Sequence, residues 1–352
     1  MIRRPPRSTL SSSSAASDVY KRQIRARGCE VGNSASQFDV DTTLSWEGIH
    51  DAIVALGLER NILELECDGI TTIAPEQSGV TPGFISKVRK ELIRLCGEIT
   101  DREFLEERGP DQAIPELEPR NTFLIFQLLA YRIPEFEEVM LNPALQTLMG
   151  YLLGPERRLS SLSGFIKWQS SEPPEGNRFE PYGLHTDTPL KSTLPLAPLQ
   201  VANSNFLLTN FATWEDGPMV VAKGSHREGR HPLESDAARM EGYYAPAGSF
   251  VVFGGCLQHG SMSRLNPGMR ISINGYFCQP YIVPQECLQG EFEDVAAKGK
   301  LASQLVWQDA SNGWGVQGPA FMPTPFTKKT SPSSGYGYLP KHQHPNSKLT
   351  QG

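Results

Sequence analysis

The chain has 352 residues, of which 39% are hydrophobic and 20% are charged, and its formal net charge at pH 7 is −6. These values are typical of a globular protein, and the acidic balance argues against nucleic acid as a partner. No apolar run reaches membrane-spanning length, and the six cysteines show no CxxC spacing, so we expect a cytoplasmic protein with reduced thiols and no membrane partner.

The two ends of the chain differ in composition from its body. Residues 1–23 are rich in Arg and Ser, lack apolar periodicity and resemble a translated sequencing adapter, so we expect a non-native or disordered leader. Residues 326–352 are polar and rich in Ser, Lys and Gly, and a disordered tail is expected there. The residues between them, 24–325, are expected to form a single domain.

The first part of this domain carries mainly helical signals. The segment that begins at Thr81-Pro82 has proline at an early helical position and apolar residues on one face. Residues 24–158 are therefore expected to be mainly helical and to support the rest of the domain. Helices are expected over 46–56, 81–96 and 135–153 and a strand over 70–73, while 121–129 fits either strand or helix.

From residue 159 the chain consists of short segments rich in β-branched and aromatic residues, separated by Gly, Pro and Asn. Such a pattern indicates a sandwich or barrel. The predicted fold class is α+β, with flanking α-helices around a double-stranded β-helix, the jelly roll of cupin type, over 159–290. Residues 291–325 are expected to pack against this core. The expected strands are Ser163–Trp168, Gln200–Thr209, Pro218–Ala222, Ser249–Gly254 and Arg270–Phe277.

A candidate metal site lies among these strands. His185 and Asp187 are two residues apart, so in an extended strand both side chains point to the same face. His259, far downstream, is the best supplier of a third ligand, and the resulting 2-His-1-carboxylate set favours non-haem Fe(II) and oxygen chemistry. His226 competes for the third place, but the arginines beside it disfavour a neutral ligand histidine. Thr186 points to the opposite face, and we assign it no role.

The strand expected over 270–277 has two unlike faces. In a barrel that holds a ligand, the polar face would be the binding wall and the apolar face would pack against the surrounding cover. Alternatively, Arg270 faces solvent and the apolar face is the core, and alternation alone does not choose between the two. The polar face comprises Arg270, Ser272, Asn274 and Tyr276, and the other face comprises Ile271, Ile273, Gly275 and Phe277.

Several motifs together resemble the phytanoyl-CoA dioxygenase family, a branch of the Fe(II)/2-oxoglutarate oxygenases. The resemblance covers about residues 57–320 and is densest over 159–280. One departure is Lys223, where family members usually have proline before Gly-Ser-His. The motifs are Leu184-His-Thr-Asp187, Asp216-Gly-Pro218, Gly224-Ser-His-Arg227 and Phe253-Gly-Gly-Cys-Leu-Gln-His-Gly-Ser261, with Arg270 eleven residues after His259.

The resemblance implies a role for each matching residue. His185, Asp187 and His259 match the iron ligands, and no catalytic residue beyond these ligands is implied. Arg270 matches the arginine that pairs with the distal carboxylate of 2-oxoglutarate, and Ser261 matches a hydroxyl that assists it. A weaker match is Asn203 or Asn205, on one face of their strand, as a further contact with the cosubstrate. The implied cofactors are Fe(II), 2-oxoglutarate as cosubstrate and O2.

The function expected from the resemblance is hydroxylation of a C–H bond in a small organic substrate, with decarboxylation of 2-oxoglutarate to succinate and CO2. The substrate itself is not readable, because one fold and metal site serve many substrates. We expect the wall of its pocket in the 170–180 segment and in the N-terminal half. The alternatives are a non-catalytic cupin-like binding protein and an iron-dependent halogenase, and Asp187 disfavours the halogenase because halide replaces the carboxylate ligand in those enzymes.

Overall fold

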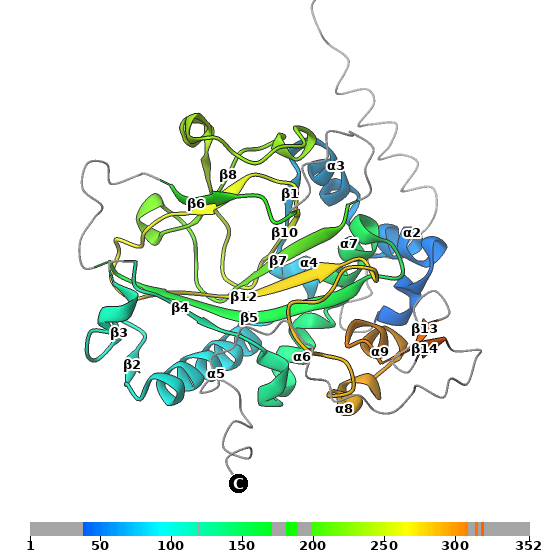
Figure 1. Cartoon of the computed structure of the whole chain (residues 1–352), viewed down its shortest axis with the longest axis horizontal. Helices are drawn as coiled ribbons and strands as arrows, with labels where there is room; N and C mark the ends of the chain where they lie inside the picture. Colours follow the sequence, from blue (N-terminus) through cyan, green and yellow to red (C-terminus); the bar gives the residue numbers. More distant parts are fainter. Residues whose placement is uncertain are drawn as a thin grey trace, which may run out of the picture.

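The computed structural model of the chain describes residues 38–118, 120–170, 181–188 and 199–308, together with two short strands at 314–315 and 318–319. The expected leader and the expected tail lie outside these residues, as does the 171–180 part of the expected substrate wall. Within the described part, two antiparallel sheets face each other, and helices lie against the outer face of the larger sheet (Figure 1). This arrangement confirms the predicted α+β jelly roll with flanking helices.

The larger sheet has the strand order β1-β10-β7-β12-β5-β4, and the smaller sheet has the order β6-β11-β8-β9. Each of the five strands expected after residue 159 is present, and β5 begins earlier than expected. The larger sheet contains β1 (Ile70–Ile73), β4 (Thr122–Ile125), β5 (Arg158–Trp168), β7 (Val201–Leu207), β10 (Phe250–Gly254) and β12 (Met269–Cys278). The smaller sheet contains β6 (Tyr182–His185), β8 (Met219–Val221), β9 (Glu241–Tyr243) and β11 (His259–Ser261). Two further pairs join β2 (Phe104–Leu105) to β3 (Gly109–Pro110) and β13 (Trp314–Gly315) to β14 (Gly318–Pro319).

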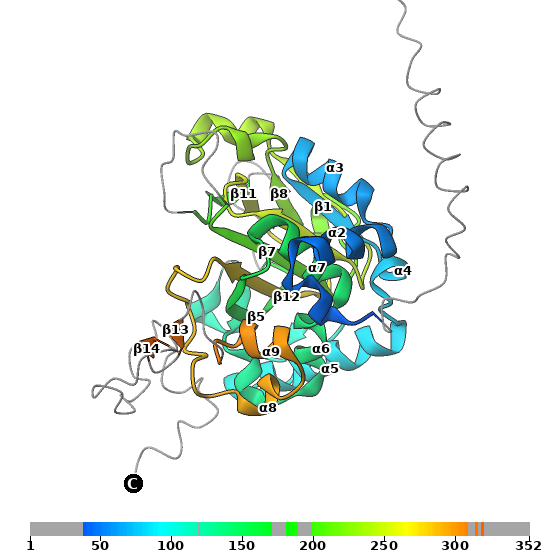
Figure 2. The ribbon, with the colours of Figure 1, turned by 90° about the vertical axis from the view of Figure 1, so that its right-hand side faces the viewer.

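Helices lie below and beside the larger sheet, on the side away from the smaller sheet's strands β6 and β8 (Figure 1). Figures 1 and 2 show α5 and α6 below it, with α8 and α9 on the same side. The α-helices are α2 (Trp46–Ala55), α3 (Glu59–Asp68), α4 (Pro75–Ser78), α5 (Pro82–Thr100), α6 (Pro134–Met140), α7 (Pro143–Leu153), α8 (Glu293–Ala296) and α9 (Lys300–Leu305). The 3₁₀ turns are η2 (Val40–Leu44), η3 (Pro115–Leu117), η4 (Leu128–Tyr131), η5 (Trp214–Asp216), η6 (Ser225–Arg227) and η7 (Glu234–Arg239).

Local sequence signals account for where these helices begin. The Thr81 side chain accepts a hydrogen bond from the Phe84 N–H and so caps α5, and Pro82 occupies the first turn. The helical segment expected over 135–153 is two helices, α6 and α7. Proline cannot continue a helix from the residues before it, and Asn142 caps the new helix by accepting hydrogen bonds from two backbone N–H groups. The segment 121–129, for which the sequence fitted either strand or helix, contains the strand β4 and the start of the turn η4.

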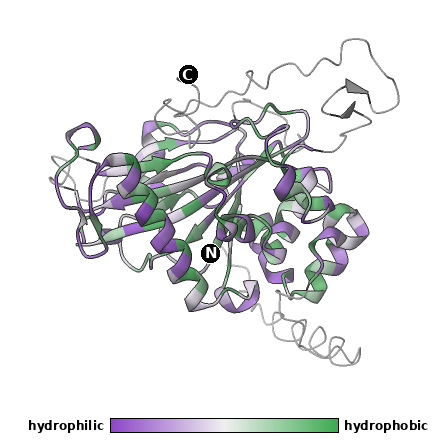
Figure 3. Cartoon of the chain, turned by 90° about the horizontal axis from the view of Figure 1, so that it is seen from below, coloured by the Kyte–Doolittle hydropathy of each residue, from purple (hydrophilic) through white to green (hydrophobic). Residues whose placement is uncertain are grey.

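The main apolar core lies between the larger sheet and the helices. Val88 and Leu92 on α5 pack there with Ile166, Ile271 and other apolar residues of the sheet. Figure 3 shows the alternation of hydrophobic and hydrophilic residues along the helices that produces such a face. Each fully buried aliphatic side chain stabilises the fold by about 1.5–3 kcal/mol relative to its exposed form. The helical layer therefore fixes the larger sheet and leaves its opposite face to the smaller sheet.

Helix α5 approaches the sheet closely at one glycine. A Cβ atom added to Gly164 on β5 would lie 2.7 Å from Cδ2 of Leu92, too close for a carbon contact. The glycine thus lets the helix pack directly on the strand. Among the described residues, none of the helices combines the length and the apolar character needed to cross a membrane.

Candidate metal centre

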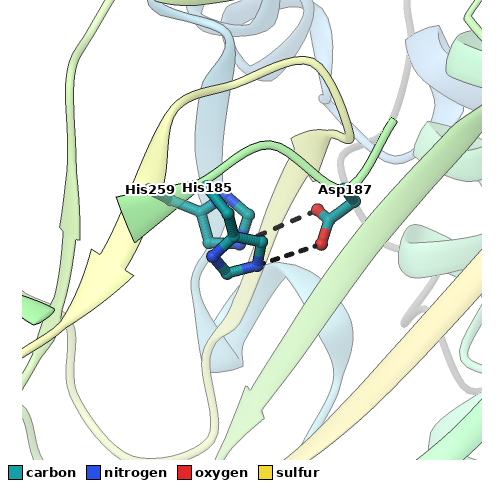
Figure 4. A group of neighbouring side chains, drawn as sticks. All are labelled: His185, Asp187 and His259. Carbon is teal, nitrogen blue, oxygen red and sulfur yellow. Dashed lines mark ion pairs between the residues drawn. The ribbon is translucent and has the colours of Figure 1, made fainter. Parts of the chain in front are cut away.

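The candidate metal site lies in the smaller sheet, at the edge that strand β6 forms. Strands β6 and β11 are antiparallel neighbours, and His185 lies directly opposite His259 in their register. Asp187 follows the end of β6, where its backbone N–H donates a hydrogen bond to the carbonyl of Gly255. Segments about seventy residues apart in the sequence are thereby brought together, and Figure 4 shows the three side chains converging.

The distances within this group are short enough for one metal ion. The Nε2 atom of His185 lies 3.4 Å from Oδ1 of Asp187, and Nε2 of His259 lies 3.7 Å from Oδ2 (Figure 4). One candidate ligand atom from each of the three residues lies within 4.8 Å of the others. The His185 side chain is 51% exposed, whereas those of Asp187 and His259 are 16% and 11% exposed. The group therefore has one open side, next to His185.

Hydrogen bonds hold both imidazoles in the orientation that metal binding requires. Nδ1 of His185 contacts the carbonyl of Gly183 at 2.6 Å, and Nδ1 of His259 contacts the carbonyl of Leu257 at 3.0 Å. A carbonyl can only accept, so each Nδ1 carries the proton and each Nε2 presents its lone pair to the centre. Two imidazole nitrogens and a carboxylate are the donor set of non-haem Fe(II) sites with open positions. The residues present thus fit such an ion.

Electrostatic effects on the two imidazoles differ. The Asp187 carboxylate, whose Oδ1 lies 3.4 Å from Nε2 of His185, raises the pKa of that histidine. Burial lowers the pKa of His259, which favours the neutral ring that a metal ligand must have. The Asp187 carboxylate also accepts a hydrogen bond of 2.7 Å from Nδ2 of Asn203 on β7. The larger sheet therefore helps to orient the carboxylate that the smaller sheet carries.

Two further residues considered from the sequence, His226 and Thr186, are not members of the three-residue group. The His226 side chain lies against Gly69, where a Cβ atom would be 2.4 Å from Nδ1 of the histidine. His226 is not part of the His185, Asp187 and His259 group in the described residues. Thr186, to which the sequence assigns no role, contacts Nδ1 of His231 through its hydroxyl at 2.8 Å.

Arg270 lies on the polar face of β12, which faces the smaller sheet. The residue is 5% exposed, so the alternative in which it faces solvent is wrong. Its Nη1 atom donates to the carbonyl of Gly217 and to Oγ of Ser261, the latter at 3.3 Å. Its guanidinium carbon lies 5.1 Å from the ring centroid of Phe165 and 4.7 Å from that of Phe211. Burial lowers the pKa of Arg270 to about 10, so the side chain is a cation at neutral pH.

The two asparagines have different contacts. Asn203 donates to Asp187, whereas Nδ2 of Asn205 lies 3.5 Å from Sδ of Met219 on β8. Both are half-buried on the face of β7 that points between the sheets. Asn203 is thus adjacent to the candidate metal site. Asn205 lies two residues further along β7, on the same face.

Lys167 on β5 is a site residue that was not anticipated from the sequence. It is fully buried and lies directly opposite Arg270 in the β5–β12 register. Burial and then the charge of Arg270 lower the pKa of Lys167 well below its ordinary value. One signal could have indicated it: a lone lysine with the apolar residues Phe165 and Ile166 before it and Trp168 after it.

The chain matches a known protein family. The family model described as phytanoyl-CoA dioxygenase (PhyH) matches residues 90–272, which is more than half of the chain. No curated protein matches the chain.

The chain is also similar to several solved structures, at low sequence identity. HygX from Streptomyces hygroscopicus, crystallised with nickel and 2-oxoglutarate, is 16% identical with a TM-score of 0.50, over 68% of this chain and 94% of HygX. The epimerase SnoN, in complex with Fe3+, alpha ketoglutarate and nogalamycin RO, is 16% identical with a TM-score of 0.45, over 63% of this chain and 84% of SnoN. AviO1 from Streptomyces viridochromogenes Tue57 is 18% identical with a TM-score of 0.44, over 63% of this chain and 95% of AviO1.

The jelly roll, the group of two histidines and one aspartate, and the family match over more than half of the sequence lead to one conclusion. The chain belongs to the phytanoyl-CoA dioxygenase family and is an Fe(II)/2-oxoglutarate-dependent oxygenase.

Proposed function

We propose that this oxygenase hydroxylates a C–H bond of a small organic molecule, with His185, Asp187 and His259 as the iron ligands. When bound, Fe(II) and 2-oxoglutarate supply the oxidising chemistry, in which one oxygen atom of O2 enters succinate as CO2 is lost and the other enters the substrate. Arg270 and Ser261 bind the distal carboxylate of 2-oxoglutarate, Asn203 orients Asp187, and Asn205 is a further candidate contact on the same wall.

The observation that carries this proposal is the placement of His259 and Ser261 on one short strand. The two residues are two positions apart on β11, so both side chains lie on one face, about 6.6 Å apart along an extended strand. His259 belongs to the candidate metal group, and Ser261 contacts the buried Arg270. A five-carbon 2-oxo acid separates its oxo group from its far carboxylate by a distance of this order. One ligand can therefore reach both ends of the site.

The residues of this chain have distinct tasks in the proposed reaction. The three ligands leave open positions on a bound ion, and the exposed side of His185 is where substrate and O2 enter. Arginine meets a carboxylate with two parallel hydrogen bonds, so Arg270 fixes the position of the cosubstrate as well as supplying charge. Because Asp187 occupies a ligand position, halide has no place beside 2-oxoglutarate and O2, and the proposed product is hydroxylated.

The proposal is tested by succinate formation and by iron binding. Replacing His185, Asp187 or His259 by alanine should abolish the iron-dependent conversion of 2-oxoglutarate to succinate, because two ligands hold the ion poorly. His226→Ala is the matched control: it removes a half-buried histidine outside the group and should retain stoichiometric Fe(II) binding. Loss of iron in His226→Ala together with its retention in His259→Ala would overturn the ligand assignment. A parent protein that binds 2-oxoglutarate without ever forming succinate would instead indicate a non-catalytic binding protein.

A further inference from the structure

Two residues beside the candidate ligands have side chains that turn away from the metal group. Thr186 separates the two ligands at the end of β6, and Gln258 directly precedes His259, the first residue of β11. Neighbouring side chains of an extended chain point to opposite faces, so both residues point to the outer face of the smaller sheet. The 225–239 segment, which contains the turns η6 and η7, lies above β6 and β8 on that same side (Figures 1 and 2).

Gln258 is attached to this segment through its side chain and its backbone. The side chain is fully buried, and its Oε1 accepts a hydrogen bond from Nη2 of Arg239 at 2.7 Å. Its Nε2 donates to Oε2 of Glu228 at 3.3 Å and to the carbonyl of Arg230 at 3.4 Å. The backbone N–H donates to Oγ of Ser225 at 2.9 Å. The residue that precedes one candidate ligand is therefore held by hydrogen bonds to a single segment.

The same segment also contacts the end of the other ligand-bearing strand. Nδ1 of His231 lies 2.8 Å from Oγ1 of Thr186. His231 directly follows Arg230, whose carbonyl accepts the hydrogen bond from Gln258. Two consecutive residues of the segment thus lie behind the metal group, one bound next to the β6 ligands and the other next to the β11 ligand.

Four charged side chains, which we call the charged ring, fix the shape of this segment. Arg230 donates to the two carboxylate oxygens of Asp236 at 2.6 and 2.9 Å, and its Nη2 lies 2.8 Å from Glu228. Arg239 donates to the two carboxylate oxygens of Glu228 at 2.5 and 2.9 Å, and its Nε lies 2.9 Å from Asp236. Hydrogen bonds from Arg239 lower the pKa of Glu228, and those from Arg230 lower the pKa of Asp236. All four side chains are therefore charged at neutral pH, in a network with bidentate geometry.

The pairing of β6 with β11 shows why such an attachment matters. In the described part of the chain, β6 lies at the edge of the smaller sheet and pairs with β11 alone. His185 lies opposite His259 and Tyr182 lies opposite Ser261, with an irregularity between the two pairs. A slip of one residue would turn His185 to the other face, and an irregular ladder guards poorly against it. Contacts outside the ladder are needed to fix the two histidines relative to each other.

We propose that Gln258 and His231 are positioning residues for the metal centre, through which the charged ring holds β6 and β11 in the arrangement that brings the three ligands together. The inference rests on the proposed ligand set and extends it. Neither residue touches the ion or the substrate, and both raise the affinity for Fe(II) because they preorganise the ligands before the ion binds.

The first test is a double-mutant cycle on Gln258 and Arg239, measured by anaerobic titration with Fe(II). Gln258→Met keeps the length of the side chain and removes its hydrogen bonds, so Fe(II) affinity should fall about 3- to 10-fold. Arg239→Met should weaken binding in the parent by a similar factor and by a smaller factor in the Gln258→Met background, because part of its effect passes through Gln258. Arg239→Lys should recover part of the loss, since an ammonium group still donates to an amide oxygen. Arg94→Met is the matched control, because Arg94 also pairs with two glutamates, on α5, and it should leave Fe(II) affinity unchanged.

The second test is Thr186→Val, which removes the hydroxyl that contacts His231 and keeps the shape of the side chain. Fe(II) affinity should fall about 3- to 10-fold, and this variant serves also if Gln258→Met does not fold. Thr100→Val removes a comparable hydroxyl on α5, which donates to the carbonyl of Cys96 at 2.7 Å, and should have no effect on Fe(II) binding.

Parental Fe(II) affinity in Gln258→Met or in Thr186→Val would overturn the role of the attachment that the variant removes. This holds even if the melting temperature falls, because lower stability with unchanged metal affinity is the result of a merely structural role. Equal losses from Arg239→Met in both backgrounds would also overturn the inference, since Arg239 would then act independently of Gln258. A parent protein that binds no Fe(II), or His259→Ala with parental affinity, would instead refute the proposed ligand set.

Discussion

The two faces of strand β12 differ in what surrounds them, although both belong to one strand of ten residues. Ile271, Ile273 and Phe277 point into the core shared with the helices. Arg270 and Tyr276 point toward the smaller sheet, where Oη of Tyr276 contacts the backbone carbonyl of Asp187 at 3.4 Å. The apolar face therefore serves stability, and the proposed function assigns ligand binding to the polar face. A strand with unlike faces can do both because successive side chains point in opposite directions.

The largest expected effect on the polar face is that of Arg270→Ala. Removing one partner of a buried charge pair costs about 3–5 kcal/mol, because the other charge is left uncompensated. At about 1.4 kcal/mol per tenfold, 2-oxoglutarate binding should weaken roughly 10²- to 10³-fold while Fe(II) still binds. Arg270→Lys should recover only part of this loss, since an ammonium group cannot make the bidentate contact. Titration of 2-oxoglutarate into the anaerobic iron-loaded variants measures this affinity. If Arg270→Ala binds 2-oxoglutarate as tightly as the parent, the cosubstrate assignment is refuted.

On the apolar face, Ile273→Ala should have the opposite profile. The side chain is 1% exposed in the main core, so its truncation should lower the free energy of unfolding by about 2–5 kcal/mol. Affinity for 2-oxoglutarate in the variant that remains folded should stay within about twofold of the parent. Urea denaturation measures the first quantity, and the titration above measures the second.

Asn274→Ala, the next residue on the opposite face, is the matched control for this variant. The side chain is half-buried and accepts one hydrogen bond, from Ser272 at 3.3 Å. The expected loss of unfolding free energy is about 0.5–1.5 kcal/mol. A larger loss for Asn274→Ala than for Ile273→Ala would break the division of the strand into a stabilising face and a binding face.

A pH-dependent effect on stability is expected from Glu286, a buried ionisable group outside the ligand site. Its carboxyl oxygens accept hydrogen bonds from the backbone N–H groups of Gln127 at 2.9 Å and Leu162 at 3.3 Å. Burial raises the pKa of Glu286 from 4.5 to about 8. Between these two values the unfolded chain has lost this proton and the folded chain has kept it, so the free energy of unfolding falls as the pH rises.

Glu286→Gln should remove this part of the pH dependence, because an amide does not titrate. The melting temperature of the variant relative to the parent should therefore increase between about pH 5 and about pH 8, and level off above that range. Thermal denaturation of both proteins in the same series of buffers measures the difference, in which the contributions of other groups cancel. A difference that is constant with pH would contradict a raised pKa at Glu286.

Much of the architecture follows from local patterns in the sequence. The helix that begins at Pro82, the strands after residue 159 and the jelly-roll fold are confirmed. The helical segment expected over 135–153 was divided by proline, a signal present in the sequence at Pro143. The spacing of His185 and Asp187 predicts a shared face, and the structure places both beside His259. Their role as iron ligands stays a prediction, as do the roles of the residues that surround the cosubstrate.

The sequence by itself determined the alternation of β12 and the family resemblance, because both depend on residue types at short, regular spacing. Only the tertiary structure decided which face of that strand is enclosed by helices and which by the smaller sheet, since a period of two defines faces without saying what covers them. The environment of Lys167 was decided in the same way. Its partners Tyr182, Ser261 and Arg270 come from three other strands, and no local pattern specifies that these strands meet.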